Sequence, residues 1–103
     1  MNDSVEGSRN DLEAVRARLT QHAERLATLR SELASIRVTE VSEGGTITVV
    51  VDGNGAMVDL RLSPGISRMR ASQFERALVA TAATAAERAF GMQANLIETF
   101  NTT

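Results

Sequence analysis

Residues 44–64 read GGTITVVVDGNGAMVDLRLSP, and two runs in this stretch alternate apolar with polar side chains. A period of two places the apolar set on one face of a β-strand. The apolar members are Ile47, Val49, Val51, Val58, Leu60 and Leu62. Between the runs, Asp52-Gly53-Asn54-Gly55 contains two turn-forming dipeptides. The stretch predicts a β-hairpin whose two apolar sets point into the same core.

The flanking residues predict a third strand and mark where the sheet ends. Val38 and Val41 lie among β-tolerant residues, and Gly44-Gly45 separates them from the hairpin. Ser63-Pro64-Gly65 ends the last strand, because proline donates no hydrogen bond to a sheet. We therefore expect a three-stranded antiparallel meander with one apolar and one polar face.

Residues 10–36 carry the clearest periodicity in the chain. Apolar positions recur at alternating spacings of three and four, which is typical of a heptad repeat on a helix. These positions are Leu12, Val15, Leu19, His22, Leu26, Leu29, Leu33 and Ile36. Asn10, with Glu13 three residues later, resembles a helix N-cap with its reciprocal glutamate. Residues 1–9 are accordingly expected to form a flexible tail.

A second long helix is predicted from a capping box at Ser72 and Glu75 to about Thr99. Its apolar face would hold Leu78, Ala82, Ala85, Ala89, Met92 and Leu96. Seven alanines in residues 77–89 favour a helix and let a neighbour approach closely. A single helical turn is expected at residues 66–70. The sequence thus predicts one α+β domain at residues 10–99, with a C-terminal tail at residues 100–103.

The predicted helices are longer than the predicted sheet. Helices of this size span on the order of 40 Å, whereas six-residue strands cover about 20 Å. A three-stranded sheet also leaves two open edges and cannot bury both apolar stripes alone. We expect a second copy to complete the core, giving a tweezer-like homodimer with projecting helical arms. The helix or dimer seam would then include Leu19, His22, Leu26 and Leu29.

The composition argues against several classes of protein. With one histidine and no cysteine, lysine or tyrosine, the chain lacks most nucleophiles and general bases. We expect no enzyme, no cofactor, no metal site and no small-molecule substrate. No run of 18 apolar residues predicts a membrane span, and the acidic N-terminus is unlike a signal peptide. A cytoplasmic location is expected.

The basic residues are unevenly distributed, although the net charge is −2. All eleven are arginine, and six of them fall in residues 9–37 beside four acids. This segment therefore carries +2, whereas the rest of the chain carries −4. The first helix can attract phosphate, and the remainder repels it.

The order of these motifs resembles the YbaB/EbfC family of small bacterial nucleoid-associated proteins. Residues 44–55 look like that family's bend, strand and hairpin, and residues 58–64 look like its next strand, with Ser63 where aspartate is usual. Residues 74–82 are similar to the start of its last helix. The resemblance covers roughly residues 10–95. It implies a tweezer-shaped homodimer that binds duplex DNA with limited sequence preference through charged residues on its arms.

By position, the resemblance assigns DNA contact to Arg16, Arg18, Arg25 and Arg30. The last three have no acid three or four residues away, so they need water, acids of another helix, or phosphate. Guanidinium groups suit phosphate oxygens and give affinity without reading sequence. A solvated rim, or bridges to acids of the second helix, is the alternative for these arginines.

His22 occupies a core-like heptad position. It is read as a seam residue satisfied by water or by a partner chain, and a lone histidine argues against a metal ligand. A register-setting or pH-sensitive contact is the other interpretation.

Two functions are compatible with these patterns. The first is a homodimeric nucleoid-associated protein that binds duplex DNA largely through phosphates. The second is a protein–protein module or scaffold, for example a type VII secretion-associated protein of the same fold, which offers its apolar seam to a partner helix. The negative net charge and the missing lysines favour the second function, and the arm arginines favour the first.

Overall fold

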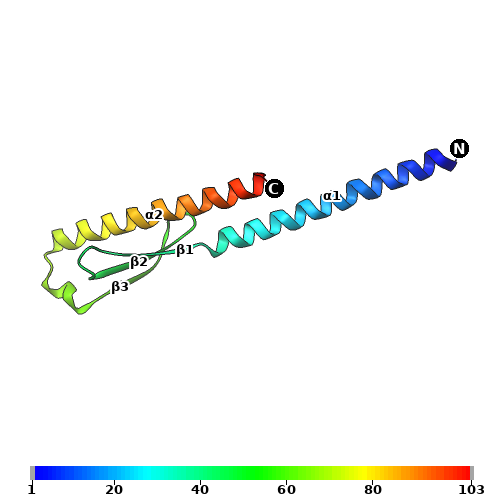
Figure 1. Cartoon of the computed structure of the whole chain (residues 1–103). Coiled ribbons are helices and arrows are strands. Elements are labelled where there is room, and N and C mark those ends of the chain that lie inside the picture. The colour runs from blue at the N-terminus through cyan, green and yellow to red at the C-terminus, as the bar shows by residue number, and fades with distance from the viewer. Residues whose placement is uncertain (1, 103) are drawn as a thin grey trace.

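A computed structural model describes the backbone of residues 2–102 and the side chains of residues 8–102. Its elements are α1 (Asn2–Ser35), β1 (Arg37–Val41), β2 (Ile47–Asp52), β3 (Met57–Leu62), the 3-10 helix η1 (Pro64–Arg68) and α2 (Ala71–Thr102). The order confirms the predicted α+β arrangement. Figure 1 shows α2 lying along one face of the sheet while α1 projects away from it. The molecule measures 85 × 19 × 15 Å along its principal axes.

The sheet is an antiparallel meander with strand order β1-β2-β3. In its register Val49 lies opposite Leu60, and Ile47 lies opposite Leu62. Residues directly opposite each other share a face of the sheet, so the apolar sets of β2 and β3 point the same way. An irregularity between Val50 and Val51 shifts the start of β3, as a β-bulge does.

The core lies between α2 and the first two strands. Its buried members are Ile36, Val38, Ile47, Val49, Val51, Ala85 and Ala89. The apolar face predicted for β2 is confirmed, because its three members are almost fully buried. The small side chains of Ala85 and Ala89 let the backbone of α2 approach the sheet, which explains how so thin a molecule excludes water from β2.

Between β2 and β3, residues 53–55 form a loop that is closed by a backbone hydrogen bond between Asp52 and Ala56. The Asp52 carbonyl accepts from the Gly55 N–H at 3.0 Å, and the Asp52 N–H donates to the Ala56 carbonyl at 2.9 Å. Gly55 adopts a φ of +79°, as expected for a type I turn followed by a left-handed residue. The Asp52 carboxylate also accepts from the backbone N–H groups of Asn54 and Ala56. Asp52 therefore stabilises the predicted turn through both its backbone and its carboxylate.

This hairpin loop fits tightly between the two helices. A Cβ added to Gly53 would meet the Leu33 carbonyl oxygen at 3.1 Å. A Cβ on Gly55 would meet the Phe90 ring at 2.9 Å. The loop thus contacts the end of α1 on one side and α2 on the other, and it helps to set where α1 leaves the sheet.

The helix ends differ from those predicted. α1 begins at Asn2 rather than at Asn10, because no proline interrupts the preceding residues and the helix continues through the local capping signal. The expected flexible tail is helical from residue 2, and Met1 lies outside the described residues. α2 continues to Thr102, through most of the predicted C-terminal tail. The domain boundaries at residues 10 and 99 stay a prediction.

The start of α2 uses a different cap from the predicted one. The Gln73 side-chain oxygen accepts from the Arg70 backbone N–H at 3.0 Å, and the Phe74 N–H donates to the Arg70 carbonyl. Gln73 therefore takes the reciprocal role that the sequence assigned to Glu75. The predicted single turn is present as η1, which begins at Pro64 rather than at Ile66.

Candidate nucleic-acid interface

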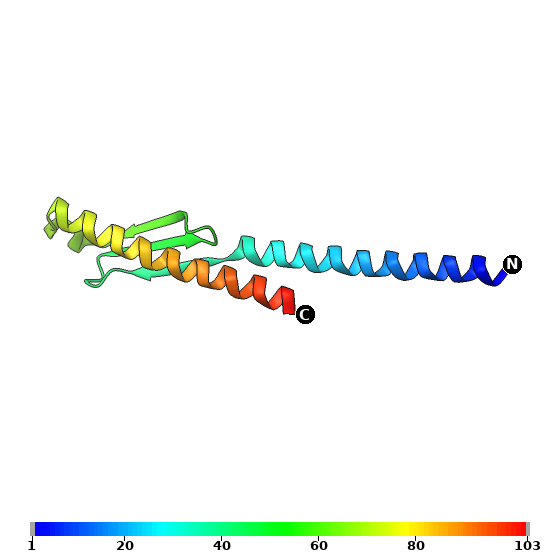
Figure 2. The same cartoon turned by 90° about the horizontal axis from the view of Figure 1, so that it is seen from above.

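The α1 arm, defined here as residues 8–24, extends past the end of α2. Figure 2 shows α1 continuing as a straight rod beyond the C-terminus of α2. Among residues 8–35, only the second half of α1 contacts the rest of the molecule: Arg25 bonds to Phe100 of α2, and Leu33 packs against the core. At about 1.5 Å per residue, the arm is roughly 25 Å long.

The predicted seam residues divide into two groups. Leu29 is half-buried, whereas Leu19, His22 and Leu26 are exposed in the single chain. Leu12 and Leu19 are 68% and 64% exposed, so the heptad stripe of the arm has no cover within the described residues of this chain. The His22 ring lies 5.9 Å from the Phe100 ring.

Arg16, Arg18 and Arg30 are exposed along α1. Within residues 8–102, none of the three forms an ion pair or a side-chain hydrogen bond. The alternative in which these arginines bridge to Glu75 or Glu87 of α2 is therefore not observed within the chain. Their guanidinium groups point into solvent on both sides of the apolar stripe, where a polyanion can reach them.

Arg25 differs from the other three arginines that were assigned to DNA contact, because it has partners in α2. Its Nη2 donates to the Phe100 carbonyl oxygen at 2.9 Å, and its guanidinium carbon lies 4.9 Å from the Phe100 ring centroid. The guanidinium thereby satisfies a carbonyl in the last turn of α2, where the helix dipole is negative. Arg25 ties α1 to α2. Sequence reasoning missed this contact because Phe100 lies 75 residues away.

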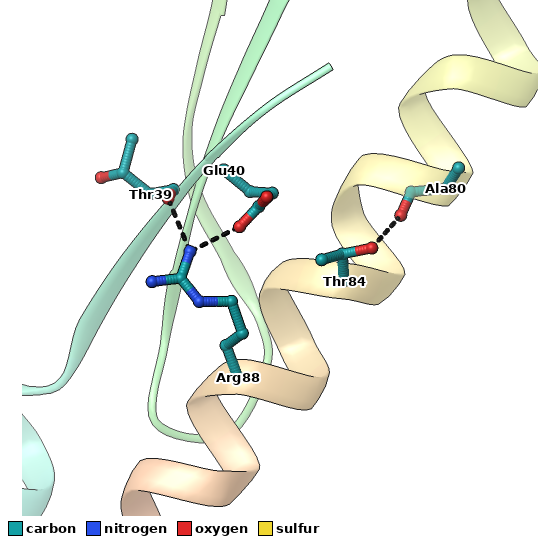
Figure 3. Close-up of polar contacts among 5 residues, drawn as sticks. All are labelled: Thr39, Glu40, Ala80, Thr84 and Arg88. Carbon is teal, nitrogen blue, oxygen red and sulfur yellow. Dashed lines mark hydrogen bonds and ion pairs between the residues drawn. The ribbon is translucent and has the colours of Figure 1, made fainter. Parts of the chain in front are cut away.

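The arginine at the centre of α2 is also engaged in the fold. Figure 3 shows Arg88 reaching from α2 to β1, where its Nη1 contacts the Glu40 carboxylate and donates to the Thr39 carbonyl oxygen. One turn earlier, the Thr84 hydroxyl donates to the Ala80 carbonyl at 3.1 Å. Arg88 therefore links α2 to β1, and its guanidinium group is not free to bind an anion.

The third strand carries an uncovered apolar strip. Val58, Leu60 and Leu62 were predicted to point inward, and the register shows that Leu60 and Leu62 share the face of the buried β2 residues. They are nevertheless 48%, 39% and 47% exposed, because α2 crosses above β1 and β2 and leaves β3 at the edge. The expectation of burial is wrong for the isolated chain. Contiguous exposed apolar side chains of this kind are characteristic of interaction sites.

The described region has shallow grooves beside α1 and beside the start of α2. One groove, of about 600 Å³, lies between α1 and the end of α2, with Arg25, Leu29, Leu96 and Phe100 among its lining residues. In residues 8–102 no three metal-ligating side chains gather to hold an ion. Neither long helix, over the residues described, has an apolar stretch that would span a bilayer.

Comparisons with known proteins agree with this geometry. The family model described as "YbaB/EbfC DNA-binding family" matches residues 9–102. Among solved structures, the chain is similar to the uncharacterized protein HP0035 from Helicobacter pylori, with a TM-score of 0.66 and 18% sequence identity. That match covers 82% of this chain and 90% of the other. The comparison with curated proteins gives no match.

Proposed function

The chain belongs to the YbaB/EbfC DNA-binding family, and on that basis we propose that it acts as a cytoplasmic, nucleoid-associated homodimer. The homodimer binds duplex DNA through phosphate contacts with limited sequence specificity. The α1 arm and the arginines beside it make the contacts. The family is a DNA-binding one rather than a family of enzymes.

The observation that carries the proposal is that three arginines of α1 are exposed and have no side-chain partner among the described residues. Arg16, Arg18 and Arg30 are exposed and, in the part of the chain described, unpaired. They are spread over roughly 21 Å of helix, at 1.5 Å per residue. Duplex DNA presents one phosphate charge per 1.7 Å or so of its axis, and guanidinium forks match phosphate oxygens. We assign phosphate contact to these three residues and a positioning role to Arg25.

The homodimer is supported by apolar surface that the single chain leaves open. Leu60 and Leu62 of β3 lie next to the buried face of β2 and have no cover. A second copy that packs over this strip would bury it and extend the core across the open strand edge. Two copies also double the number of arm arginines presented to one ligand.

Limited specificity is expected because of which groups the arm offers. Arginines on a solvent-exposed helix reach phosphates easily, and such contacts position a protein on DNA without identifying the bases. Across residues 9–37, six arginines outnumber four acids, which leaves this segment with a net charge of +2. The resulting moderate positive charge favours weak binding at many sites rather than strong binding at one.

The direct test is a mobility-shift titration of the intact protein with random-sequence duplexes at low and high salt. The proposal expects a shift at low salt that weakens steeply as salt rises, and little difference between unrelated duplexes. Sedimentation equilibrium at micromolar concentration should give twice the chain mass. A monomer, or the absence of any shift at low salt, would contradict the proposal.

One observation favours a second candidate function, a protein–protein module without DNA binding. Leu12 and Leu19 are largely exposed on the arm, and phosphate contact needs neither of them. An apolar helix stripe is the usual surface for a partner helix. A co-purified protein that binds the intact chain and is lost in a Leu12→Asp, Leu19→Asp variant, together with no DNA shift, would decide for this function.

A further inference from the structure

A second group of arginines lies at the end of the molecule opposite the arm. Figure 1 places η1 and the start of α2 at one end of the long axis and the N-terminal arm at the other. Arg68, Arg70 and Arg76 belong to this end, and all three are exposed. We call them the pole cluster. Glu75 is the one acid in residues 63–76, which therefore carry +2 in a chain whose net charge is −2.

The backbone that carries the pole cluster is held by hydrogen bonds. The Ser63 N–H donates to the Thr46 carbonyl, and the Met69 N–H donates to the Ile66 carbonyl. The Thr46 hydroxyl also contacts the Met69 sulfur at 3.4 Å. Because Ile66 packs against the core, this short segment is anchored from inside. The arginines beside it are presented from a fixed base, which lowers the entropic cost of binding a ligand.

No carboxylate neutralises the pole cluster within the described residues. The two ion pairs there, Arg61 with Asp59 and Arg88 with Glu40, involve none of its arginines. Six such charges, three from each copy, would also repel one another if this end formed the contact between two copies. The uncovered β3 strip is a better candidate for the contact between two copies. The pole cluster then remains accessible to an anion.

The charge between the two basic regions is negative. Residues 38–62 hold four acids against one arginine, so a duplex lying along the whole molecule would pass a surface that repels it. The arm and the pole cluster are also at opposite ends of an 85 Å axis. Two separate duplexes, one at the arm and one at the pole cluster, could contact both basic regions without passing the acidic residues 38–62.

We propose that the pole cluster is a second duplex-DNA contact surface, so that one dimer holds two duplexes together. This inference rests on the proposed DNA binding of the arm and adds a bridging activity to it. The pole cluster contacts phosphates, as the arm does, and contributes no base recognition.

The test is a bridging assay with the full-length protein. Biotinylated duplex is fixed to streptavidin beads, and a fluorescent duplex without biotin is captured from solution at low salt. The variant Arg68→Ala, Arg70→Ala, Arg76→Ala is expected to lower capture about tenfold or more while its mobility shift with single duplexes changes less than about twofold. The matched variant R68K/R70K/R76K keeps the charge and should retain capture.

Each outcome of the assay bears on the inference. If the parent shifts single duplexes but captures no second duplex, bridging is refuted and the proposed function stands. Capture by the alanine variant at the parent level, or equal loss of shift and capture, also refutes a separate pole surface. If the parent binds no DNA at all, the proposed function fails as well. Selective loss of capture with an intact shift supports the pole cluster and shows that the variant is folded.

Discussion

Replacing Arg16, Arg18 and Arg30 together by alanine is expected to remove most of the salt dependence of DNA binding. These side chains are exposed and, among the described residues, unpaired, so their loss should leave the fold intact. A homodimer carries six of them. If each neutralises one phosphate, the slope of log K against log salt is about −0.9 per contact, or about −5 in all.

That slope predicts a large effect over an ordinary range of salt. Raising the salt fourfold, from about 50 to about 200 mM, lowers the affinity of the parent by roughly 10³. When it is made in the Arg68→Ala, Arg70→Ala, Arg76→Ala background, so that the pole cluster does not contribute, the triple variant should bind weakly at every salt concentration, with a nearly flat dependence. Fluorescence anisotropy of a labelled duplex of about 30 base pairs, titrated at three salt concentrations, measures both slopes.

The control is the same triple substitution to lysine, which keeps the charge and loses only the guanidinium fork. It should retain most of the slope, with somewhat weaker binding because lysine meets phosphate as a point charge. An alanine variant whose slope stays within about one unit of the parent's would refute the assignment of phosphate contact to these residues.

Three further predictions concern the fold. Leu60→Asp places a charge on the uncovered β3 strip and should convert the dimer to monomer in sedimentation equilibrium; an unchanged mass would reject this strip as the interface. Gly55→Ala should lower the free energy of unfolding, measured by urea denaturation, by about 1–2 kcal/mol, because φ is +79° and the added Cβ would meet the Phe90 ring. The control Gly44→Ala should be nearly neutral in the same measurement, because its Cβ would meet nothing within 4 Å. Arg25→Ala removes the contact with Phe100 and should speed amide exchange in the last turns of α2; unchanged exchange there would mean that the contact does not hold the helices together.

The pattern of β2 and β3 shows how far a period of two can be used. Ile47, Val49 and Val51 alternate along β2 and are buried, so the pattern identified the correct face. Leu60 and Leu62 alternate equally well and lie on the same face, yet they are exposed. Alternation predicts which way a side chain points. Whether another element covers that side depends on the path of α2, which no local pattern encodes.

The helix ends show a similar limit. Asn10 is a good cap by residue type, but nothing before it terminates the helix, and α1 begins at Asn2. At the second helix, Gln73 makes the reciprocal capping bond two residues earlier than the box starting at Ser72 predicts. Caps compete with one another over a few residues, and tertiary contacts such as the packing of Phe74 against the core select among them.

The candidate site was predictable only in part. The family resemblance assigned Arg16, Arg18 and Arg30 to DNA contact by position, and the structure leaves them exposed on α1. The resemblance gave no sign that Arg25 would be held by Phe100, because that pairing depends on two helices meeting far apart in sequence. Contacts between i and i+4 can be read from a sequence, but contacts between distant helices require the fold.

The attachment of α1 at a single end has a mechanical consequence. Packing beside Gly53 and the contact of Arg25 with Phe100 hold the helix from about His22 onward, so its free part, residues 8–21, is about 20 Å long. Tilting this part by some ten degrees would move its tip by about 4 Å, and two arms that tilt in opposite directions in the proposed homodimer would change their separation by about 7 Å. That change is comparable to the difference between a narrow and a wide DNA groove, so one pair of arms can grip duplexes of differing local shape.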